Sequence, residues 1–208
     1  MIASEGDARS YVTQLSNEQA IARLDILVEE LLRENELQNL VAKATLPAMW
    51  QRHIADSAQL LEFCDASTPW LDLGSGAGFP GLVIAAMRPE LPVILVESRR
   101  RRVDWLERSA ARMELANCRV EGRRLEQVEA FPAGVISARA FAPLDRLLAL
   151  SARFSTSRTH WVLPKGRSAE QEVLGLPKGR NSMFHVKQSL TDPEAGIIVG
   201  RGKWSATA

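Results

Sequence analysis

The sequence predicts an α/β fold in which a mostly parallel, seven-stranded sheet follows an N-terminal helical cap and ends in an antiparallel hairpin. Two observations support this prediction. From residue 70 onward, short apolar runs alternate with segments whose apolar residues recur at helical spacing. At residues 183–201, two strand-like runs flank a turn-rich loop, Thr-Asp-Pro-Glu-Ala-Gly, which is typical of a hairpin.

The first 66 residues predict the helical cap, which we do not expect to be an independent domain; the core spans residues 67–208. Apolar side chains within residues 16–39 fall on one helical face, and Ser16 with Gln19 matches a capping box at the start of that helix. Pro47 is expected to open a second helix, which runs to Leu61.

Strands and helices alternate through the core. Strands are expected at residues 70–73, 93–97, 119–121, 134–137, 160–163, 183–190 and 197–201. Helices are expected at residues 80–88, 99–116 and 143–154, with Ser98 as the cap of the second. Because β-α-β units follow one another, right-handed crossovers should make the sheet mostly parallel.

The composition is ordinary for a globular protein, and its net charge of +1 produces no global field for nucleic acid. Positive charge is instead local, because Arg99 to Arg102 are consecutive. The two cysteines, Cys64 and Cys118, lack metal-ligand spacing, so we expect no metal site and a reduced, cytoplasmic setting. We see no signal peptide, and no apolar run approaches the roughly 20 residues of a membrane span.

A glycine-rich turn at residues 72–81, Asp-Leu-Gly-Ser-Gly-Ala-Gly-Phe-Pro-Gly, joins the first strand to its helix. Glycines allow positive φ and close approach of a ligand to the backbone, so the turn predicts a nucleotide-like cofactor. Two glycine registers overlap in it. The first, Gly76-x-Gly78-x-x-Gly81 with Glu97 further along, fits a dinucleotide such as NAD.

The second register, Gly74-x-Gly76-x-Gly78 preceded by Asp72, fits S-adenosylmethionine. The Asp72 carboxylate would repel a pyrophosphate but is compatible with a sulfonium and an ammonium group. Pro80 removes an amide donor from the helix start that a pyrophosphate would use. These residues favour S-adenosylmethionine, and an NAD-dependent oxidoreductase is the alternative.

Four elements occur in order: Arg-His-Ile-Ala-Asp-Ser at residues 52–57, the glycine turn at 72–81, Ser-Ala-Arg-Ala-Phe-Ala at 137–142, and Lys-Gly at 165–166. Together they resemble the glucose-inhibited division protein B family, the guanine-N7 methyltransferases of small-subunit ribosomal RNA. The resemblance implies a class I (Rossmann-like) S-adenosylmethionine-dependent methyltransferase that acts on 16S ribosomal RNA. One departure is Ala138, since the family pattern usually reads Ser-Arg-Ala. We expect a monomer, because nothing in the sequence demands a larger assembly. We also expect no membrane partner.

The resemblance also implies which residues contact the cofactor, beyond Gly76 and Gly78. Gly74 and Phe79 would lie beside its methionine and ribose, and Glu97 would hold the ribose. The pair Leu125 and Glu126 would border the adenine.

Arg139 matches the family arginine near the methyl-transfer site, where it would contact the cofactor and position the reacting groups. Guanine N7 carries an in-plane lone pair and no proton, so direct in-line displacement at the sulfonium methyl requires no general base. The sequence accordingly offers no catalytic triad. The candidate RNA contacts are basic side chains of the flanking elements: Arg52, His53, Lys165 and Arg167.

For His53 and for the arginine run, a plainer alternative exists. His53 would otherwise form a hydrogen bond with Asp56, three residues further on, and orient the cap. The run from Arg99 to Arg102 is either a solvated face or a contact for RNA phosphates. For the whole chain, a non-catalytic RNA-binding assembly factor with a relic fold is a further alternative.

Overall fold

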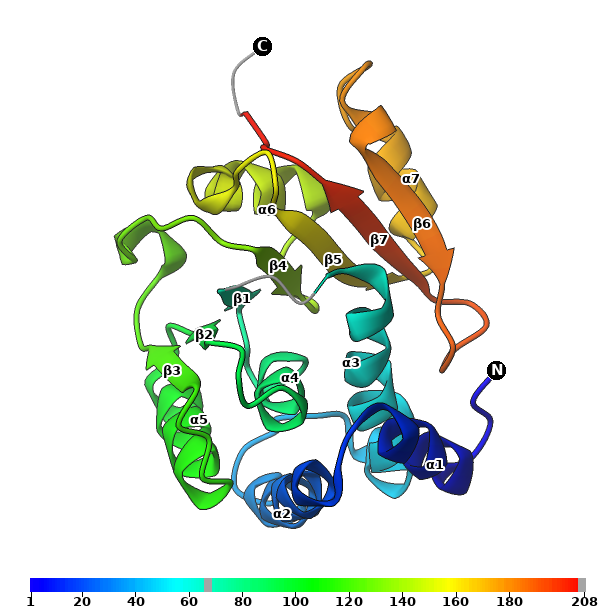
Figure 1. Cartoon of the computed structure of the whole chain (residues 1–208), viewed down its shortest axis with the longest axis vertical. Helices are drawn as coiled ribbons and strands as arrows, with labels where there is room; N and C mark the ends of the chain where they lie inside the picture. The colour runs from blue at the N-terminus through cyan, green and yellow to red at the C-terminus, as the bar shows by residue number, and fades with distance from the viewer. Residues whose placement is uncertain (66–68, 206–208) are drawn as a thin grey trace.

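The computed structural model describes residues 1–65 and 69–205, and it confirms the predicted seven-stranded sheet (Figure 1). The order across the sheet is β3-β2-β1-β4-β5-β7-β6. Strands β1 to β5 are parallel to one another, whereas β7 runs antiparallel between β5 and β6, which confirms the C-terminal hairpin. The strands are β1 (Trp70–Leu73), β2 (Val93–Val96), β3 (Cys118–Glu121), β4 (Val135–Ala138), β5 (His160–Gly166), β6 (Phe184–Gln188) and β7 (Gly196–Arg201).

Both faces of the central strands β1, β2 and β4 are buried, as a parallel sheet between helices requires, whereas the edge strands β3 and β6 are partly exposed. Successive side chains of β1 point to opposite faces, so Trp70 joins one hydrophobic cluster while Leu71 and Leu73 join the other. The N-terminal cap, α4 (Gly81–Met87) and α5 (Arg100–Arg112) cover the first face. The second face is covered by α6 (Leu144–Ser151) and α7 (Ala169–Leu174), as Figure 1 shows.

The N-terminal cap contains a helix that the sequence analysis missed, α1 (Glu5–Leu15), before α2 (Glu18–Glu34). The apolar stripe of α1 is narrow, because only Ala8 and Val12 are buried. The predicted capping box is wrong: the Asn17 side chain caps α2 by accepting a hydrogen bond from the amide of Ala20, and Ser16 instead ends α1.

The second helix, α2, ends before the expected residue 39 because the Asn35 side chain turns the chain there, accepting hydrogen bonds from the next loop. Its fully buried residues, Leu24, Leu27 and Leu31, belong to the same hydrophobic cluster as the sheet face that they cover. Cap and core therefore share one hydrophobic core on this side. The expected boundary after residue 66 lies outside the described residues.

The regular helix expected from Pro47 is replaced by four short helical pieces. They are a 3-10 helix (Lys43–Ala48), a π-helical turn (Trp50–Ala55), α3 (Asp56–Ala58) and a second 3-10 helix (Gln59–Phe63). Pro47 lies inside the first piece rather than at its start. The π-helical turn contains Arg52 and His53, and such turns are frequent at functional sites.

Within the two described ranges, 1–65 and 69–205, no helix is both long and apolar enough to cross a membrane.

Candidate functional site

The glycine-rich turn forms the predicted tight loop between β1 and α4. Gly74, Gly76 and Gly78 have φ angles of 65°, 55° and 100°, which L side chains rarely adopt. A Cβ atom at Gly74 would also lie 2.5 Å from Cδ2 of Phe141. The loop therefore requires glycine for its conformation and, at Gly74, for the space that Phe141 occupies.

Glu97, directly after β2, joins the glycine loop to the start of α5. Its Oε2 accepts a hydrogen bond from the amide of Gly76 at 3.2 Å, and its Oε1 accepts from the amides of Ser98 and Arg99 at 2.7 and 2.8 Å. The predicted Ser98 cap is therefore wrong, since Arg99 holds the N-cap position and Glu97 takes the free amides. A carboxylate oxygen accommodates about two donors, so Oε2 retains an acceptor position that fits a ribose hydroxyl.

Asp72 lies at the base of the loop and is completely buried. The Ser137 hydroxyl donates to its Oδ1 at 2.7 Å, and the indole of Trp70 donates to that hydroxyl at 2.8 Å. Its Oδ2 has no well-formed hydrogen bond among the described residues and lies beside Gly81, whose backbone amide still favours the ionised carboxylate. Burial raises the pKa of Asp72 to about 6, against the opposing effect of its hydrogen bonds. A buried carboxylate is costly without a partner, so an unsatisfied oxygen at this loop fits a cofactor that carries positive charge.

Three side chains from different elements meet at the end of the loop. The His53 ring stacks on Phe79 with centroids 5.0 Å apart and an interplanar angle of 18°. The Arg139 guanidinium, directly after β4, lies 4.9 Å from the centroid of the same ring. Arg139 Nη1 is also 3.2 Å from His53 Nδ1 and 3.6 Å from Asp56 Oδ2. We call Phe79, His53 and Arg139 the central cluster.

The expected hydrogen bond between His53 and Asp56 is not formed, because Arg139 lies between them. The His53 Nδ1 accepts from Arg139, so Nε2 carries the proton and donates to Thr45 Oγ1 at 2.8 Å. Burial, with the positive charges of Arg139 and Arg52, lowers the pKa of His53 to about 3. The imidazole is therefore neutral at physiological pH. Burial also lowers the pKa of Arg139, while Asp56 opposes that effect.

A cavity of about 780 Å³ opens on the other side of the central cluster. Its walls come from the cap, the segment after β4, the end of β5 and the loop between β6 and β7. No residue of the glycine loop lines the described cavity; the two halves of the site adjoin through the central cluster and through Phe141, which lines the cavity and lies against Gly74. The predicted residues that line it are Arg52, His53, Arg139 and Lys165.

Lys165 lines the cavity with its side chain fixed by neighbouring groups. Its side chain is 9% exposed, and its Nζ lies 2.9 Å from Glu172 Oε2 and donates to the carbonyl of Ala142. Burial opposes ionisation of Glu172, but hydrogen bonds from Lys165 and Ser168 prevail and lower its pKa. This ion pair joins the end of β5 to α7 and to the segment after β4.

Arg167 stands outside the cavity, exposed, and pairs with Glu194. The sequence analysis did not identify Glu172, Asp192 or Glu194, the acids that pair with Lys165, Arg52 and Arg167. Asp192 lies 140 residues after its partner, so spacing alone contained no signal for that pair.

Leu125 and Glu126 lie in a short 3-10 helix, Leu125–Gln127, after β3. Leu125 is buried and its carbonyl accepts a hydrogen bond from Arg153, whereas Glu126 is exposed. Neither residue lines the cavity.

The arginine run at the start of α5 is not a uniform surface. Arg99 and Arg101 are exposed, and Arg100 pairs with Asp104 at 3.0 Å. Arg102 turns toward the glycine loop, where its Nη1 would lie 3.2 Å from a Cβ atom at Gly76. One member of the run is therefore part of the loop's surroundings.

Other chemistries find little support at this site. Cys64 and Cys118 are free thiols that do not line the cavity, and burial raises the pKa of each to about 12. Neither is a competent nucleophile at neutral pH. No group of three or more potential ligands for a metal ion occurs among the residues described.

The fold and the loop define an S-adenosylmethionine-dependent methyltransferase of class I. A methyltransferase of this kind from Aquifex aeolicus matches with a TM-score of 0.55 at 13% identity, over 82% of this chain and 97% of that one. A mutant of MtNAS in complex with S-adenosylmethionine matches with 0.53 at 12% identity, over 95% and 77%. The chain belongs to the GidB family, rRNA small subunit methyltransferase G, whose model matches residues 20–195.

Curated relatives agree with this membership, and each is named ribosomal RNA small subunit methyltransferase G. The protein from Erythrobacter litoralis is 59% identical over 204 residues, 98% of this chain and 99% of its own. Those from Novosphingobium aromaticivorans and Methylobacterium nodulans are 55% and 42% identical, over 96% and 95% of this chain and 89% and 95% of their own. The family resemblance is confirmed, and neither the oxidoreductase nor the non-catalytic factor is favoured.

Proposed function

We propose that this chain methylates N7 of a guanine in the 16S RNA of the small ribosomal subunit, with S-adenosylmethionine as methyl donor. The observation that supports this most is the central cluster, which stands between the glycine loop and a cavity lined by cationic side chains. A cofactor on the loop and an RNA base in the cavity would meet at this cluster. The three side chains would then align the two reacting atoms.

The chemistry requires positioning rather than proton transfer. Bound S-adenosylmethionine supplies a methyl group on a positively charged sulfur. The N7 lone pair forms the new bond as the sulfur leaves, so positive charge moves to the guanine and no proton is released. His53 suits this role because it is neutral and both ring nitrogens are engaged, by Thr45 and Arg139. A general base at this position would have no proton to accept, because methylation of N7 releases none.

For the cofactor, we propose that the loop glycines Gly74, Gly76 and Gly78 form its cradle beside Phe79. Glu97 would hold the ribose through its Oε2, and Leu125 with Glu126 would border the adenine. Arg102 and Phe141, which cover the loop, would have to make room by changing rotamer.

For the RNA, we propose that Arg52, His53 and Lys165 contact the nucleotide that enters the cavity, and that Arg167 contacts the strand outside it. Arg139 would be shared, with its guanidinium reaching both the ring of Phe79 and the cavity. We further propose that residues 1–66 fold as part of the same unit as the core, and that the protein acts as a monomer in the cytoplasm without a membrane partner.

The proposal is tested by methyl transfer. Purified small ribosomal subunits are incubated with the protein and methyl-labelled S-adenosylmethionine, and the RNA is digested to nucleosides. We expect the label in 7-methylguanosine. In parallel, S-adenosylmethionine at about 100 times its Kd should raise the free energy of unfolding by about 2.7 kcal/mol, whereas NAD should not.

Subunits incubated without the protein are the control for transfer. Label in any other nucleoside would overturn the N7 assignment. Stabilisation by NAD and not by S-adenosylmethionine would overturn the assignment of the cofactor.

A further inference from the structure

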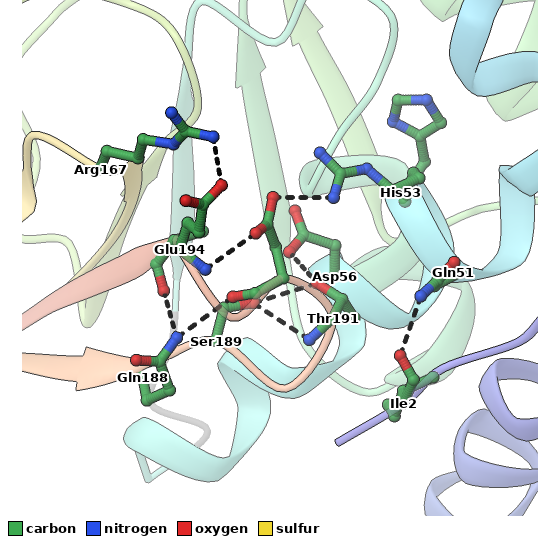
Figure 2. A network of polar contacts seen from close by, with 12 residues as sticks. Ile2, Gln51, His53, Asp56, Arg167, Gln188, Ser189, Thr191 and Glu194 are labelled. Carbon is green, nitrogen blue, oxygen red and sulfur yellow. Dashed lines mark hydrogen bonds and ion pairs between the residues drawn. The ribbon is translucent and has the colours of Figure 1, made fainter.

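The loop between β6 and β7, residues 189–195, forms one wall of the cavity and is bonded on both sides (Figure 2). It is closed on itself, because the amide of Ser189 donates to the carbonyl of Ala195 at 3.0 Å. The Gln188 side chain donates to the carbonyls of Asp192 and Ala195 at 3.1 and 3.0 Å. The wall loop, as we call residues 189–195, is therefore a pre-formed element.

The inner half of the wall loop is anchored to the cap by buried hydrogen bonds. Thr191 Oγ1 donates to Asp56 Oδ1 at 2.7 Å, and the amide of Leu190 donates to Gln59 Oε1 at 2.7 Å. Thr191 and Gln59 are both buried. Breaking such bonds would leave buried polar groups unsatisfied, so this half stays in place when the outer surface changes.

The outer half bears two carboxylates, and each neutralises an arginine that we assign to RNA. Arg52 Nη1 lies 2.8 Å from Asp192 Oδ2, with side chains 41% and 28% exposed. Arg167 pairs with Glu194, with side chains 78% and 59% exposed. Arg52 lines the cavity, and Arg167 lies between two cavity-lining residues, so the two ion pairs flank its rim.

We propose that Asp192 and Glu194 occupy, in the free protein, the places that two phosphates of the RNA strand take at the cavity rim. This inference rests on the proposed function. A guanidinium binds carboxylate and phosphate oxygens with the same planar geometry, so the exchange needs only side-chain rotation. Exposed ion pairs are weak, so a phosphate displaces the carboxylate readily.

The exchange has a consequence for selectivity. An RNA that presents phosphates to both Arg52 and Arg167 replaces the two ion pairs that it breaks. An RNA whose phosphates reach neither arginine gains nothing from them, because Asp192 and Glu194 already neutralise their charge. The wall loop thus suppresses binding of the wrong strand, which is a form of competition built into the surface. A purely structural role predicts the opposite, because Asp192 would then hold Arg52 in its binding position.

The sign of one measurement separates these roles. We would compare the wild type with Asp192→Asn/Glu194→Gln by filter binding, using purified small ribosomal subunits and an unrelated RNA of defined length. The proposal predicts about 3- to 10-fold tighter binding by the variant, more so for the unrelated RNA, because one exposed ion pair changes an equilibrium by about 1.4- to 5-fold. Raising the salt concentration should reduce the difference in RNA affinity between the variant and the wild type.

Two controls isolate the effect. Asp25→Asn removes one negative charge, half of what the double variant removes, from an exposed Arg–Asp pair on α2, outside the cavity, and should leave RNA binding unchanged. The second control completes a double-mutant cycle. In an Arg52→Ala/Arg167→Ala background, removing the two carboxylates should no longer tighten RNA binding, because the arginines that they neutralise are absent.

Weaker binding by Asp192→Asn/Glu194→Gln, or an equal gain in the arginine-free background, would overturn the inference. Methyl transfer by the wild type is scored separately, so its failure would instead count against the proposed function.

Discussion

The glycine loop and the cavity, the two halves of the site, are built in different ways. The loop is one continuous stretch, residues 72–81, and its shape follows from backbone angles and from amides bonded to Glu97. The cavity is assembled from four separate segments of the chain, and its walls are joined by side-chain ion pairs such as Lys165–Glu172 and Arg52–Asp192.

This difference fits the separate tasks that we propose for the two halves, cofactor binding at the loop and RNA binding at the cavity. Backbone geometry is hard to alter without strain, which suits a cofactor that is the same in every reaction cycle. Exposed ion pairs exchange partners at low cost, which suits an RNA surface that must be recognised and released. Variants in the loop should therefore act on cofactor binding, and variants at the cavity on the RNA and on transfer.

The largest effect is expected at the boundary between the halves. Arg139→Ala removes the cation on the Phe79 ring and the contacts to His53 and Asp56. We expect methyl transfer to fall about 100- to 1000-fold, as when a positioned hydrogen-bond donor is lost from an active site. Labelled transfer to small subunits measures the rate, and circular dichroism checks the fold.

Arg33→Ala, which removes an exposed ion-paired arginine from α2, should transfer at the wild-type rate. If Arg139→Ala lost cofactor affinity to the same extent as it lost transfer, the division between the halves would fail at this residue.

A smaller effect is expected in the loop itself. Gly74→Ala places a Cβ atom against Phe141 at a φ of 65°. We expect affinity for S-adenosylmethionine to fall about 10- to 100-fold, equivalent to about 1.4–2.8 kcal/mol, because the strain of a left-handed alanine and its contact with Phe141 would shift the loop away from the conformation proposed to hold the cofactor. Calorimetric titration measures the affinity.

Gly179→Ala is the matched control, since Gly179 also has a positive φ, 84°, but no neighbour within 4 Å of a Cβ atom. It should lose some stability and keep its cofactor affinity. Equal losses of affinity in the two variants would show that strain alone, and not the contact with Phe141, governs the loop.

The effect furthest from function is a pH-dependent change in stability at Asp72. Because burial raises its pKa to about 6, the folded protein favours the protonated carboxyl, and this contribution to stability is complete below about pH 4 and is lost as the pH rises through 6. Asp72→Asn lacks that titration. We expect the variant to gain about 2–3 kcal/mol relative to the wild type between pH 4 and pH 7.

Urea unfolding of both ligand-free proteins across this range measures the difference. A difference that does not change with pH would mean that Asp72 is ionised at little cost, and that the loop does not need a cationic ligand to balance it.

The fold could be read from the sequence to a large extent because its signals are local. Strands β1, β2 and β4 are short runs buried along their whole length, and the glycine turn marks the first crossover. Errors occurred where a distant or polar contact decides the local structure. Glu97 replaces Ser98 at the start of α5, Asn17 replaces Ser16 before α2, and α1 shows too narrow an apolar stripe to be recognised.

The site was predictable to the extent that its residues lie in sequence motifs. The motif residues His53, Phe79 and Arg139 do meet in space. The acids that pair with Lys165, Arg52 and Arg167 were not predictable, because Glu172, Asp192 and Glu194 reach these partners only through the folding of α7 and the hairpin. Pairing between segments far apart in sequence leaves no periodic pattern.

Because β7 lies antiparallel between β5 and β6, the two ends of the chain differ in how suitable they are for attaching a tag. Strand β7 begins beside the cavity, where Gly196 pairs with Gly166, and ends where Arg201 pairs with His160. The chain therefore leaves the sheet at the end of the strands that is remote from the cavity. An affinity tag or surface tether after residue 205 would present the cavity freely to a partner as large as a ribosomal subunit. An extension before Ile2 would instead lie against the wall loop, because the Ile2 amide donates to the carbonyl of Leu190 at 2.7 Å.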